Sequence, residues 1–290
     1  MGGSGQDISP VPEDTLCAIE NRAVELARLA GTEIIAALGR TLAVRYKGDP
    51  ENEASLKDPV SEVDHEVEVL IRALLGEHFP DHDILGEEID EGPSRDCDFV
   101  WAIDPVDGTT NFVNGFPLFA GSIGVLYRGQ PIVGAVWCST SHSLRPGVYH
   151  ARIGGPLSFE KEEVTPKGHN PTIRRRLAGE PQATADHSLP WDIRKTGSAA
   201  IECAFAAAHL LHVARFERPN VWDVAGGIVL VRAAGGEVRV KDEERGWIDM
   251  DRFHVPGMTN GQKASLRDWR RPLIVGDASA VERMCRSHED

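Results

Sequence analysis

Apolar residues recur along the chain at two spacings, which predict helices in some segments and strands in others. Over residues 13–38 they repeat at steps of three and four, which predicts an amphipathic helix that Gly39 ends. A second helix is predicted to begin at Ser61, a residue suited to an N-cap, and to end at Phe79-Pro80. Three more helices are predicted over residues 198–211, 221–234 and 278–286.

Continuous apolar runs predict strands between these helices. Residues 99–103 are wholly apolar, which is typical of a strand covered on both faces. The runs 120–127 and 131–137 flank Arg128-Gly129-Gln130 and predict a β-hairpin. Shorter strands are predicted over residues 41–46, 83–86, 147–152, 213–216, 237–241 and 273–275, and a polar loop over 47–59.

Because strands and helices mix in both halves, the class is α/β or α+β with two sheet-containing subdomains. A chain of 290 residues is long enough to bury a core of that size. Residues 154–180 are rich in glycine, proline and charge, so we expect a boundary there. The predicted organisation is a flexible leader (1–12), an N-terminal subdomain (13–153) and a C-terminal subdomain (154–290).

The charge balance restricts the ligands that the protein can bind. There are 31 Lys and Arg against 45 Asp and Glu, a net charge of −14. Such a chain is a poor candidate for nucleic-acid or anionic-membrane binding, and it repels phosphates unless bound cations reverse the local field. Five widely spaced cysteines, no long apolar run and no apolar leader predict a cytoplasmic protein without a disulfide framework.

Candidate chemistry is concentrated after the apolar run 99–103. Asp104 ends that run, Pro105 fixes a turn, and Asp107 follows three residues after Asp104, so both carboxylates can point at one place. Gly108 permits a close ligand, and Thr109 opens a helical turn whose N–H groups can face a phosphate. Carboxylates with a backbone carbonyl between them suit Mg²⁺, although an Asx-turn closing a strand is the simpler interpretation.

Three other segments carry acids in comparable places. Glu87 and its neighbour Glu88 follow the predicted strand 83–86, where a solvated loop is the ordinary interpretation. Asp64 lies three residues after Ser61, which a capping box alone would explain. Asp223 lies in the first turn of an apolar helix, where the helix dipole stabilises an acid.

Together these segments resemble the inositol monophosphatase family, within the fructose-1,6-bisphosphatase-like superfamily. Residues 104–112 match the family's D-P-[IVL]-D-G-T-x-N-F motif at every position, and residues 86–88 match its GEE motif. Residues 222–226 match W-D-x-A-[GA], and residues 58–64 match D-x-V-T-x-x-D with Ser61 for threonine. Gly197-Ser198-Ala199 resembles the family's G-[ST]-A turn. The resemblance runs in order from about residue 15 to about 285.

The resemblance implies a layered α-β-α-β-α sandwich of the sugar-phosphatase type and a set of metal ligands. Glu87, Asp104 and the Val106 carbonyl would hold one Mg²⁺, and Asp104, Asp107 and Asp223 a second. A third, weaker ion would contact Glu87, and Mn²⁺ is a substitute. Acids this close repel one another by about 4 kcal/mol per pair at 4 Å, so such a cluster persists only when cations fill it.

The resemblance also implies roles in catalysis. Thr109, paired with Glu87 or Asp64, would orient and deprotonate the attacking water for an in-line displacement. The N–H groups of Gly108 and Thr109 would hold the phosphate. The Gly197-Ser198-Ala199 turn, Asp107 and Glu217 would face the alcohol part of the substrate.

The predicted function is Mg²⁺-dependent hydrolysis of a small phosphorylated polyol, with inositol-1-phosphate as the first expectation. The same chemistry on fructose-1,6-bisphosphate, histidinol phosphate, NADP or 3′-phosphoadenosine 5′-phosphate stays open. So does a binding or regulatory protein that keeps the fold without turnover. The family resemblance further implies a homodimer that acts on a small phosphorylated metabolite.

Two departures from the family pattern affect these expectations. The segment between Glu217 and Asp223 is one residue shorter than in many relatives and contains Pro219, which puts the contact of Glu217 with substrate in doubt. The family's G-x-G-[AC]-[FY]-x-N-G hairpin is replaced by residues 154–159. His209 and His212 lie three apart on a predicted helix, a spacing more typical of half-buried histidines than of a metal site.

Overall fold

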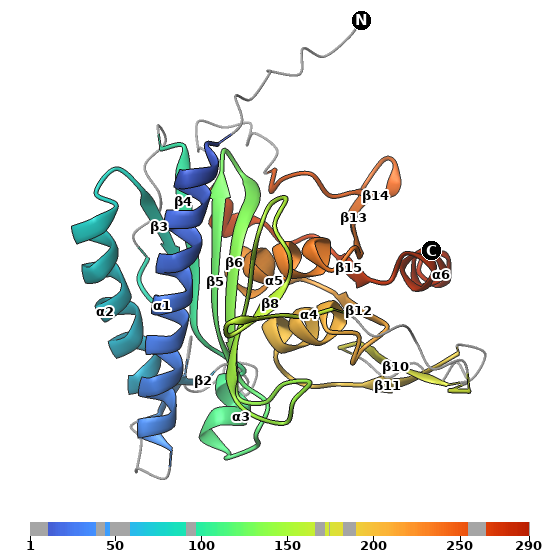
Figure 1. The fold of residues 1–290 in the computed structure, drawn as a ribbon. Helices are drawn as coiled ribbons and strands as arrows, with labels where there is room; N and C mark the ends of the chain where they lie inside the picture. Colours follow the sequence, from blue (N-terminus) through green and yellow to red (C-terminus); the bar gives the residue numbers. More distant parts are fainter. Residues whose placement is uncertain are drawn as a thin grey trace, which may run out of the picture.

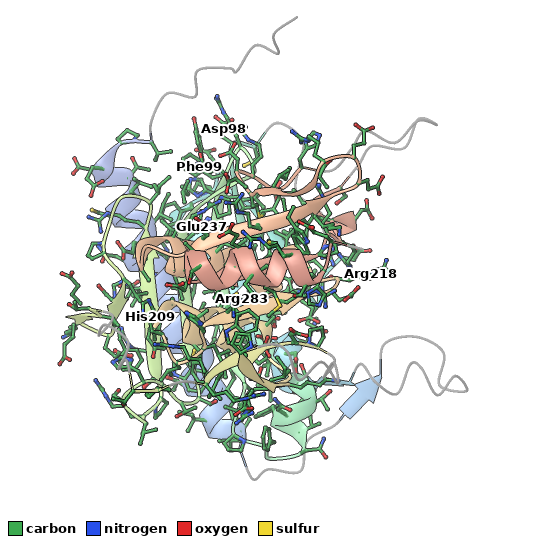
Figure 2. All side chains as sticks on the ribbon, turned by 90° about the vertical axis from the view of Figure 1, so that its right-hand side faces the viewer. Asp98, Phe99, His209, Arg218, Glu237 and Arg283 are labelled. Atoms are coloured by element: carbon green, nitrogen blue, oxygen red, sulfur yellow. The ribbon has the colours of Figure 1, made fainter. Side chains whose placement is uncertain are left out.

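Five layers alternate through the molecule in the order helix, sheet, helix, sheet, helix (Figure 1). The computed structural model describes residues 11–38, 44–46, 59–90, 97–165, 172–173, 175–181, 190–254 and 265–289. Helices α1 (Glu13–Ala37) and α2 (Glu62–His78) cover one face of the first sheet. Helices α4 (Ala199–Ala207) and α5 (Val221–Ala233) lie between the two sheets, and α6 (Ala278–Ser287) covers the second sheet from outside, where it faces the viewer in Figure 2. The predicted α-β-α-β-α sandwich is confirmed.

The first sheet has seven strands arranged in their sequence order. Strand β3 pairs in parallel with β4, and every later pair is antiparallel, including the predicted hairpin of β5 and β6. The strands are β3 (Asp83–Gly86), β4 (Phe99–Asp107), β5 (Ala120–Tyr127), β6 (Gln130–Cys138), β7 (Gly147–Arg152), β8 (Ser158–Phe159) and β9 (Glu162–Glu163). Because β8 and β9 still belong to this sheet, the change of sheet falls after Glu163 rather than at residue 153; the division into subdomains stays a prediction.

The second sheet has six strands in the order β11-β10-β12-β15-β13-β14. Strand β10 pairs in parallel with both of its neighbours, and the other pairs are antiparallel. The strands are β10 (Arg176–Gly179), β11 (Trp191–Arg194), β12 (Val213–Phe216), β13 (Glu237–Asp242), β14 (Gly246–Asp249) and β15 (Leu273–Gly276). Strands β12, β13 and β15 confirm the sequence prediction, whereas β10, β11 and β14 were missed because polar, charged and glycine residues interrupt their apolar pattern.

Three short elements complete the described chain. Strands β1 (Val44–Tyr46) and β2 (Pro59–Ser61) pair with each other, and α3 (Thr109–Val113) follows β4. A 3₁₀ turn, η2 (Leu266–Asp268), precedes β15. No helix in the described ranges has the length and apolarity that a bilayer crossing requires.

Several predicted boundaries were wrong. Pro59 was expected in a loop but pairs with Tyr46 in a small sheet, while residues 41–43 and 47–58 lie outside the described residues. The helix predicted to reach residue 211 ends at Ala207, because the Leu210 and Leu211 amides both donate to the Phe205 carbonyl and the chain then turns toward β12. Of the predicted leader, the structure describes only the two residues that immediately precede α1.

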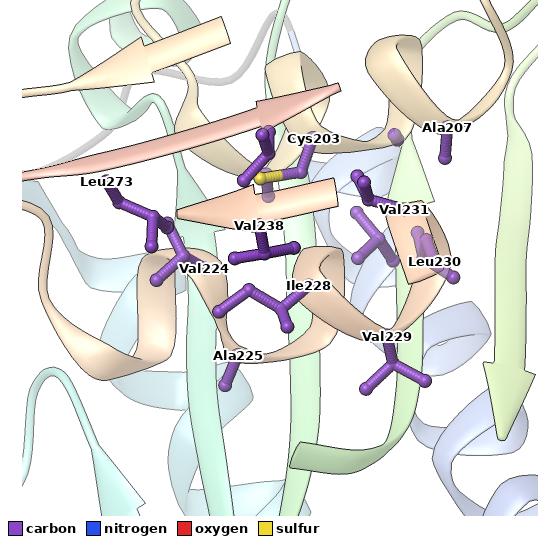
Figure 3. Packing of buried hydrophobic residues seen from close by; sticks show 14 of the residues in the cluster. Cys203, Ala207, Val224, Ala225, Ile228, Val229, Leu230, Val231, Val238 and Leu273 are labelled. Carbon is purple, nitrogen blue, oxygen red and sulfur yellow. The ribbon is translucent and has the colours of Figure 1, made fainter. Parts of the chain in front are cut away.

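Helix α5 is apolar on every side because both sheets enclose it. Its side chains Val224, Ala225, Ile228, Val229 and Leu230 are all buried. Figure 3 shows them pointing away from the helix in several directions, with Val238 and Leu273 of the second sheet close by. A helix that is apolar all round is expected only in such a buried layer. The position of α5 is therefore fixed by packing from both sheets.

Glycines bring α5 unusually close to the first sheet. A Cβ on Gly134 of β6 would lie 2.1 Å from the Gly226 carbonyl oxygen of α5, and one on Gly124 of β5 would lie 2.5 Å from the Gly226 nitrogen. Backbone atoms cannot move away as a flexible side chain can, so only glycine fits at these positions. This contact sets the distance between α5, which begins with Asp223 in its first turn, and the strands of the first sheet.

We expect Gly134→Ala to destabilise the fold, because the added methyl group must push α5 away from the sheet. Overpacking of this kind costs about 1–3 kcal/mol or more. Urea denaturation of the variant measures the change in free energy of unfolding. Gly76→Ala on α2 is the control, since its Cβ has no atom within 4 Å and it should stabilise by up to about 1 kcal/mol. Equal stability of Gly134→Ala and wild type would contradict the close packing.

Candidate functional site

Acids from separate elements converge at the carboxyl end of β3 and β4. The parallel pairing sets Gly86 beside Ile103, and the Glu87 amide donates to the Ile103 carbonyl at 3.1 Å, so Glu87 lies next to Asp104. The side chains of Glu87 and Asp104 share a hydrogen bond, and Asp104 also feels the charges of Asp107 and Asp223. The four acids that were assigned to metal binding from the sequence therefore lie close enough to interact electrostatically.

The end of β4 is irregular, which separates Asp104 from Asp107. Pairing with β5 shifts register between these two residues and resumes at Asp107, opposite Ala120. The strand was predicted to stop at Ile103, but the chain stays extended through the bulge. The Val106 amide donates to Asp104 Oδ1 at 3.1 Å. Gly108 then adopts a left-handed conformation with φ of 89° and begins the predicted helical turn, α3.

Asp64 performs two tasks with its two oxygens. Oδ2 accepts hydrogen bonds from the Ser61 amide, at 3.0 Å, and from the Ser61 hydroxyl, which completes the expected capping box of α2. Oδ1 accepts a hydrogen bond of 2.9 Å from the Thr109 hydroxyl. The capping interpretation is confirmed, and the Thr109 hydroxyl pairs with Asp64, one of the two partners predicted for it; the catalytic role of this pair stays a prediction.

Asp107 joins β4 to the start of α4. Its carboxylate accepts hydrogen bonds from the Ser198 hydroxyl at 2.7 Å, the Ala200 amide at 2.5 Å and the Ala199 amide at 3.3 Å. Gly197 provides the turn with φ of 80°. The predicted Gly197-Ser198-Ala199 segment is therefore brought to Asp107, at the edge of the acid cluster.

Asp223 is held by the residue that caps its own helix. Asn220 donates to the Asp223 carboxylate from its amide at 2.7 Å and from its side chain at 3.1 Å. Together they form a capping box at the start of α5. Asn220 is not among the residues predicted for the site, although an asparagine three residues before an acid is a recognisable cap signal.

Burial shifts the pKa of every aspartate in the cluster upward. It raises the pKa of Asp64 to about 6 and that of Asp107 to about 6. In both residues, hydrogen bonds that favour the ionised form lower the pKa, but burial has the larger effect. The pKa values of Asp104 and Asp223 lie well above the usual range, because burial and neighbouring acids both disfavour their charge. Ionised acids in such a place are stable only beside positive charge.

The donor set fits a hard divalent cation. Carboxylate oxygens and the Val106 carbonyl are the ligand types that Mg²⁺ binds, and no thiolate or imidazole competes within this set. Within the described ranges, no three Asp, Glu, His or Cys side chains are already grouped closely enough to hold one ion. Asp107 and Asp223 point oxygens at protein donors, so completing a coordination shell requires some side-chain rotation.

Glu217 follows β12 and lies at the protein surface. Its side chain is 56% exposed and pairs with Arg215 at 2.7 Å. The ion pair leaves the carboxylate accessible to a ligand, and the role of Glu217 toward substrate stays a prediction.

The histidine pair has a structural explanation. His209 lies beyond the end of α4 with φ of 59°, so it does not share a helical face with His212. His212 Nδ1 lies 3.1 Å from the Trp191 indole nitrogen, and its Nε2 lies 3.5 Å from Asp277. The prediction that both histidines lie on one helix is therefore wrong, because α4 ends at Ala207, before either of them.

Two residues that hold the site together were not predicted from the sequence. Glu68 is fully buried and accepts hydrogen bonds from the Glu88 amide at 2.7 Å and the Ile89 amide at 3.2 Å. The Asn111 side chain donates to the carbonyls of Leu118, at 2.6 Å, and Thr196, at 2.7 Å. The spacing of Asp64 and Glu68, one helical turn apart on α2, was an available signal for Glu68.

Comparison with known proteins agrees with this geometry. The model of the inositol monophosphatase family matches residues 16–268. The chain belongs to the inositol monophosphatase family. An inositol-1-monophosphatase of Synechocystis is 33% identical over 233 residues, which cover 76% of this chain and 78% of the relative. A fructose-1,6-bisphosphatase/inositol-1-monophosphatase of Aquifex aeolicus is 29% identical over 235 residues, 78% of this chain and 87% of the relative.

A solved structure agrees over almost the whole fold. The extragenic suppressor protein suhB of Bartonella henselae superposes with a TM-score of 0.70 at 25% identity, covering 93% of this chain and 98% of that one. Members of this family are generally metal-dependent phosphatases. The family and the arrangement of acids therefore lead to the same class of chemistry, while the relatives differ in the substrates that their names give.

Proposed function

We propose that this protein is a Mg²⁺-dependent phosphatase that hydrolyses small phosphorylated polyols, with inositol-1-phosphate as the first candidate. The observation that carries the proposal is the convergence of Glu87, Asp104, Asp107 and Asp223 beside the Thr109–Asp64 hydrogen bond. The acids and the threonine of the family motif are all present, which favours turnover over a binding-only role. The net charge of −14 makes local cations a requirement for phosphate binding.

Two sets of ligands are proposed for the ions. Glu87, Asp104 and the Val106 carbonyl would hold one Mg²⁺, and Asp104, Asp107 and Asp223 a second. A third ion would contact Glu87, and Mn²⁺ would substitute. When bound, such ions supply Lewis-acid stabilisation of negative charge on the phosphate and on the attacking and leaving oxygens.

Thr109 would orient the attacking water. Its hydroxyl carries one proton and donates it to Asp64 Oδ1 or to the Val106 carbonyl, each 2.9 Å away. While it donates to Asp64, its lone pairs can accept a hydrogen bond from water and set the direction of attack. Asp64 Oδ1, or the carboxylate of Glu87, would receive the proton that the water loses.

The turn from β4 into α3 would bind the phosphate. Gly108 has no side chain, and a Cβ there would lie 3.1 Å from the Leu118 carbonyl and 3.2 Å from the Gly197 carbonyl. A side chain at residue 108 would crowd these two carbonyls, and the left-handed φ of 89° also favours glycine there. The N–H groups of Gly108 and Thr109 are the proposed donors to the phosphate oxygens.

The alcohol part of the substrate would lie toward α4. Asp107, the Gly197-Ser198-Ala199 turn and Glu217 offer acceptors and donors for hydroxyl groups. A polyol suits this set better than a substrate without hydroxyls. The expected partner is a small phosphorylated metabolite rather than a nucleic acid or a membrane, and the homodimer stays a prediction.

A panel of phosphomonoesters tests the function. Phosphate release is measured with Mg²⁺ for inositol-1-phosphate, fructose-1,6-bisphosphate, histidinol phosphate, NADP and 3′-phosphoadenosine 5′-phosphate. We expect the highest kcat/KM for inositol-1-phosphate. A higher kcat/KM for another member would support a phosphatase with that substrate. If no phosphate is released from any of them, the alternative of a binding protein without turnover is favoured.

Glu217→Gln should slow hydrolysis of inositol-1-phosphate while leaving an aryl phosphate unchanged. A carboxylate that accepts substrate hydroxyls contributes about 1.5–3 kcal/mol, which corresponds to roughly tenfold or more in kcat/KM. The measurement is the ratio of kcat/KM for the two substrates, in wild type and variant. An equal fall for both would make Glu217 a structural residue, and no change for either would place it outside the substrate pocket.

A further inference from the structure

A buried ion pair on α2 holds the loop that carries Glu87. Arg72 Nε lies 2.8 Å from Glu68 Oε1, and Glu68 accepts the amides of Glu88 and Ile89. Arg72 also donates to the Ile89 carbonyl at 3.2 Å. These contacts anchor the backbone of the Glu87 loop to helix α2.

A second arginine holds the same loop from the opposite end of the chain. Arg267 of η2 donates from Nη2 to the carbonyls of Gly86 and, at 2.8 Å, Ile89. Its Nε lies 3.0 Å from Asp90 Oδ1. The two carbonyls lie on either side of Glu87, so one planar guanidinium spans the segment that carries this acid.

The same guanidinium also contacts the segment that carries Asp223. Arg267 Cζ lies 5.1 Å from the ring centroid of Trp222, which is 4% exposed and immediately precedes Asp223. The Trp222 carbonyl in turn accepts a hydrogen bond of 3.2 Å from Ser122 of β5. Trp222 therefore cannot move easily, and a cation desolvated against its face is held firmly.

We infer that Arg267 is a positioning residue, which sets the separation of Glu87 and Asp223 so that both can ligate metal at one site. The inference rests on the proposed function for the identity of the ligands. Glu87 follows a strand of the first sheet and Asp223 lies on a helix between the sheets, so their separation depends on contacts that cross between layers. Arg267 makes such a contact with a single side chain that is 20% exposed.

Geometry and charge predict opposite effects for the loss of this arginine. Removing a positive charge near a cation site would by itself strengthen cation binding. Loss of the positioning contacts should weaken it, because residues that orient metal ligands typically contribute about 10–100-fold in affinity. The sign of the change therefore separates the two roles.

Arg270 is a matched control in the same segment. It stacks on the same ring with Cζ 5.9 Å from the centroid, but its hydrogen bonds go to the neighbouring carbonyls of Arg267, at 2.9 Å, and Trp269, at 2.7 Å. Arg270→Met removes a charge and a Trp222 contact without touching the Glu87 loop.

The experiment measures Mn²⁺ binding by electron paramagnetic resonance of the free ion, which is independent of turnover. We expect Arg267→Met and Arg267→Lys to raise the Mn²⁺ dissociation constant at least tenfold, with Arg270→Met close to wild type. In phosphate release, the Mg²⁺ concentration for half-maximal rate should rise equally, with kcat recovering at saturating Mg²⁺. Lysine keeps the positive charge but lacks the planar guanidinium that donates several hydrogen bonds at once. Weak Mn²⁺ binding by Arg267→Lys would therefore show that the hydrogen-bond geometry of Arg267, and not its charge, positions the ligands.

Unchanged or tighter Mn²⁺ binding by Arg267→Met would overturn the inference, as would an equal loss in Arg270→Met. The same holds if the wild-type chain binds no Mn²⁺, since there would be no ligand set to position. If the wild type binds Mn²⁺ but releases no phosphate from any substrate, the proposed function fails while the binding comparison still decides the role of Arg267. Thermal unfolding of each variant in EDTA confirms that binding is measured on folded protein.

Discussion

Asp104→Asn is expected to lower kcat by about 10³-fold or more at saturating Mg²⁺. Asp104 hydrogen-bonds Glu87 and interacts electrostatically with Asp107 and Asp223. As the proposed shared ligand of two ions, it contributes to both. Loss of several kcal/mol of charge stabilisation corresponds to a rate change of that size.

The same substitution should leave the fold intact and, in EDTA, equally or more stable. The folded chain raises the pKa of Asp104, which means that the ionised acid is disfavoured there relative to the unfolded chain. A neutral amide removes this repulsion, and its oxygen can still accept the hydrogen bond from the Val106 amide. Activity within tenfold of wild type would contradict the shared-ligand role.

Asp98→Asn is the matched control. Asp98 lies just before the other end of the same strand, is exposed on the surface and pairs with Arg128 at 2.8 Å. Surface ion pairs of this kind contribute little, so the control should keep wild-type turnover. A large loss in both variants would point to a general effect on β4 instead of a metal site.

Thr109→Ala should lower kcat by about 10²–10⁴-fold with little change in metal affinity. The hydroxyl hydrogen-bonds Asp64 Oδ1 and is the group proposed to orient water. The proposed metal-binding oxygens belong to other residues, so removing this hydroxyl should leave Mn²⁺ binding close to wild type.

Two further variants are controls for Thr109→Ala. Thr109→Ser keeps the hydroxyl and should retain most of the activity, while Thr110→Ala changes the exposed neighbour and should behave as wild type. Weaker Mg²⁺ binding in Thr109→Ala, with kcat restored by saturating metal, would show that Thr109 acts through the ligands and not on the water.

The parts of the fold that the sequence predicts well are those with long, uninterrupted apolar patterns. Helix α1 and strands β5 and β6 have such patterns, and their apolar side chains are buried between the layers of the fold as the patterns predict. Strands β8 and β9 have two residues each, too few for any periodicity. The apolar pattern continues to Leu211 and favours helix, but hydrogen bonds to the Phe205 carbonyl and the start of β12 end the helix earlier.

The candidate site was predicted from motifs, because its proposed ligands lie at the ends of elements in short, recognisable strings. The structure brings Glu87, Asp104, Asp107 and Asp223 together, as expected from those strings. Arg267 could not be assigned in the same way. Arg267 contacts a carbonyl 181 residues away in sequence, and no local pattern encodes such a contact. Supporting residues of this kind become visible only once the chain is folded.

The most direct test is the rate of phosphate release from inositol-1-phosphate as a function of free Mg²⁺, starting from protein stripped with EDTA. The arrangement of Glu87, Asp104, Asp107 and Asp223 predicts no release above the blank in EDTA. Release should then rise with Mg²⁺ to saturation, and Asp104→Asn should abolish that rise. Release that persists in EDTA, or that never appears at any Mg²⁺ concentration, would contradict a metal-dependent inositol phosphatase.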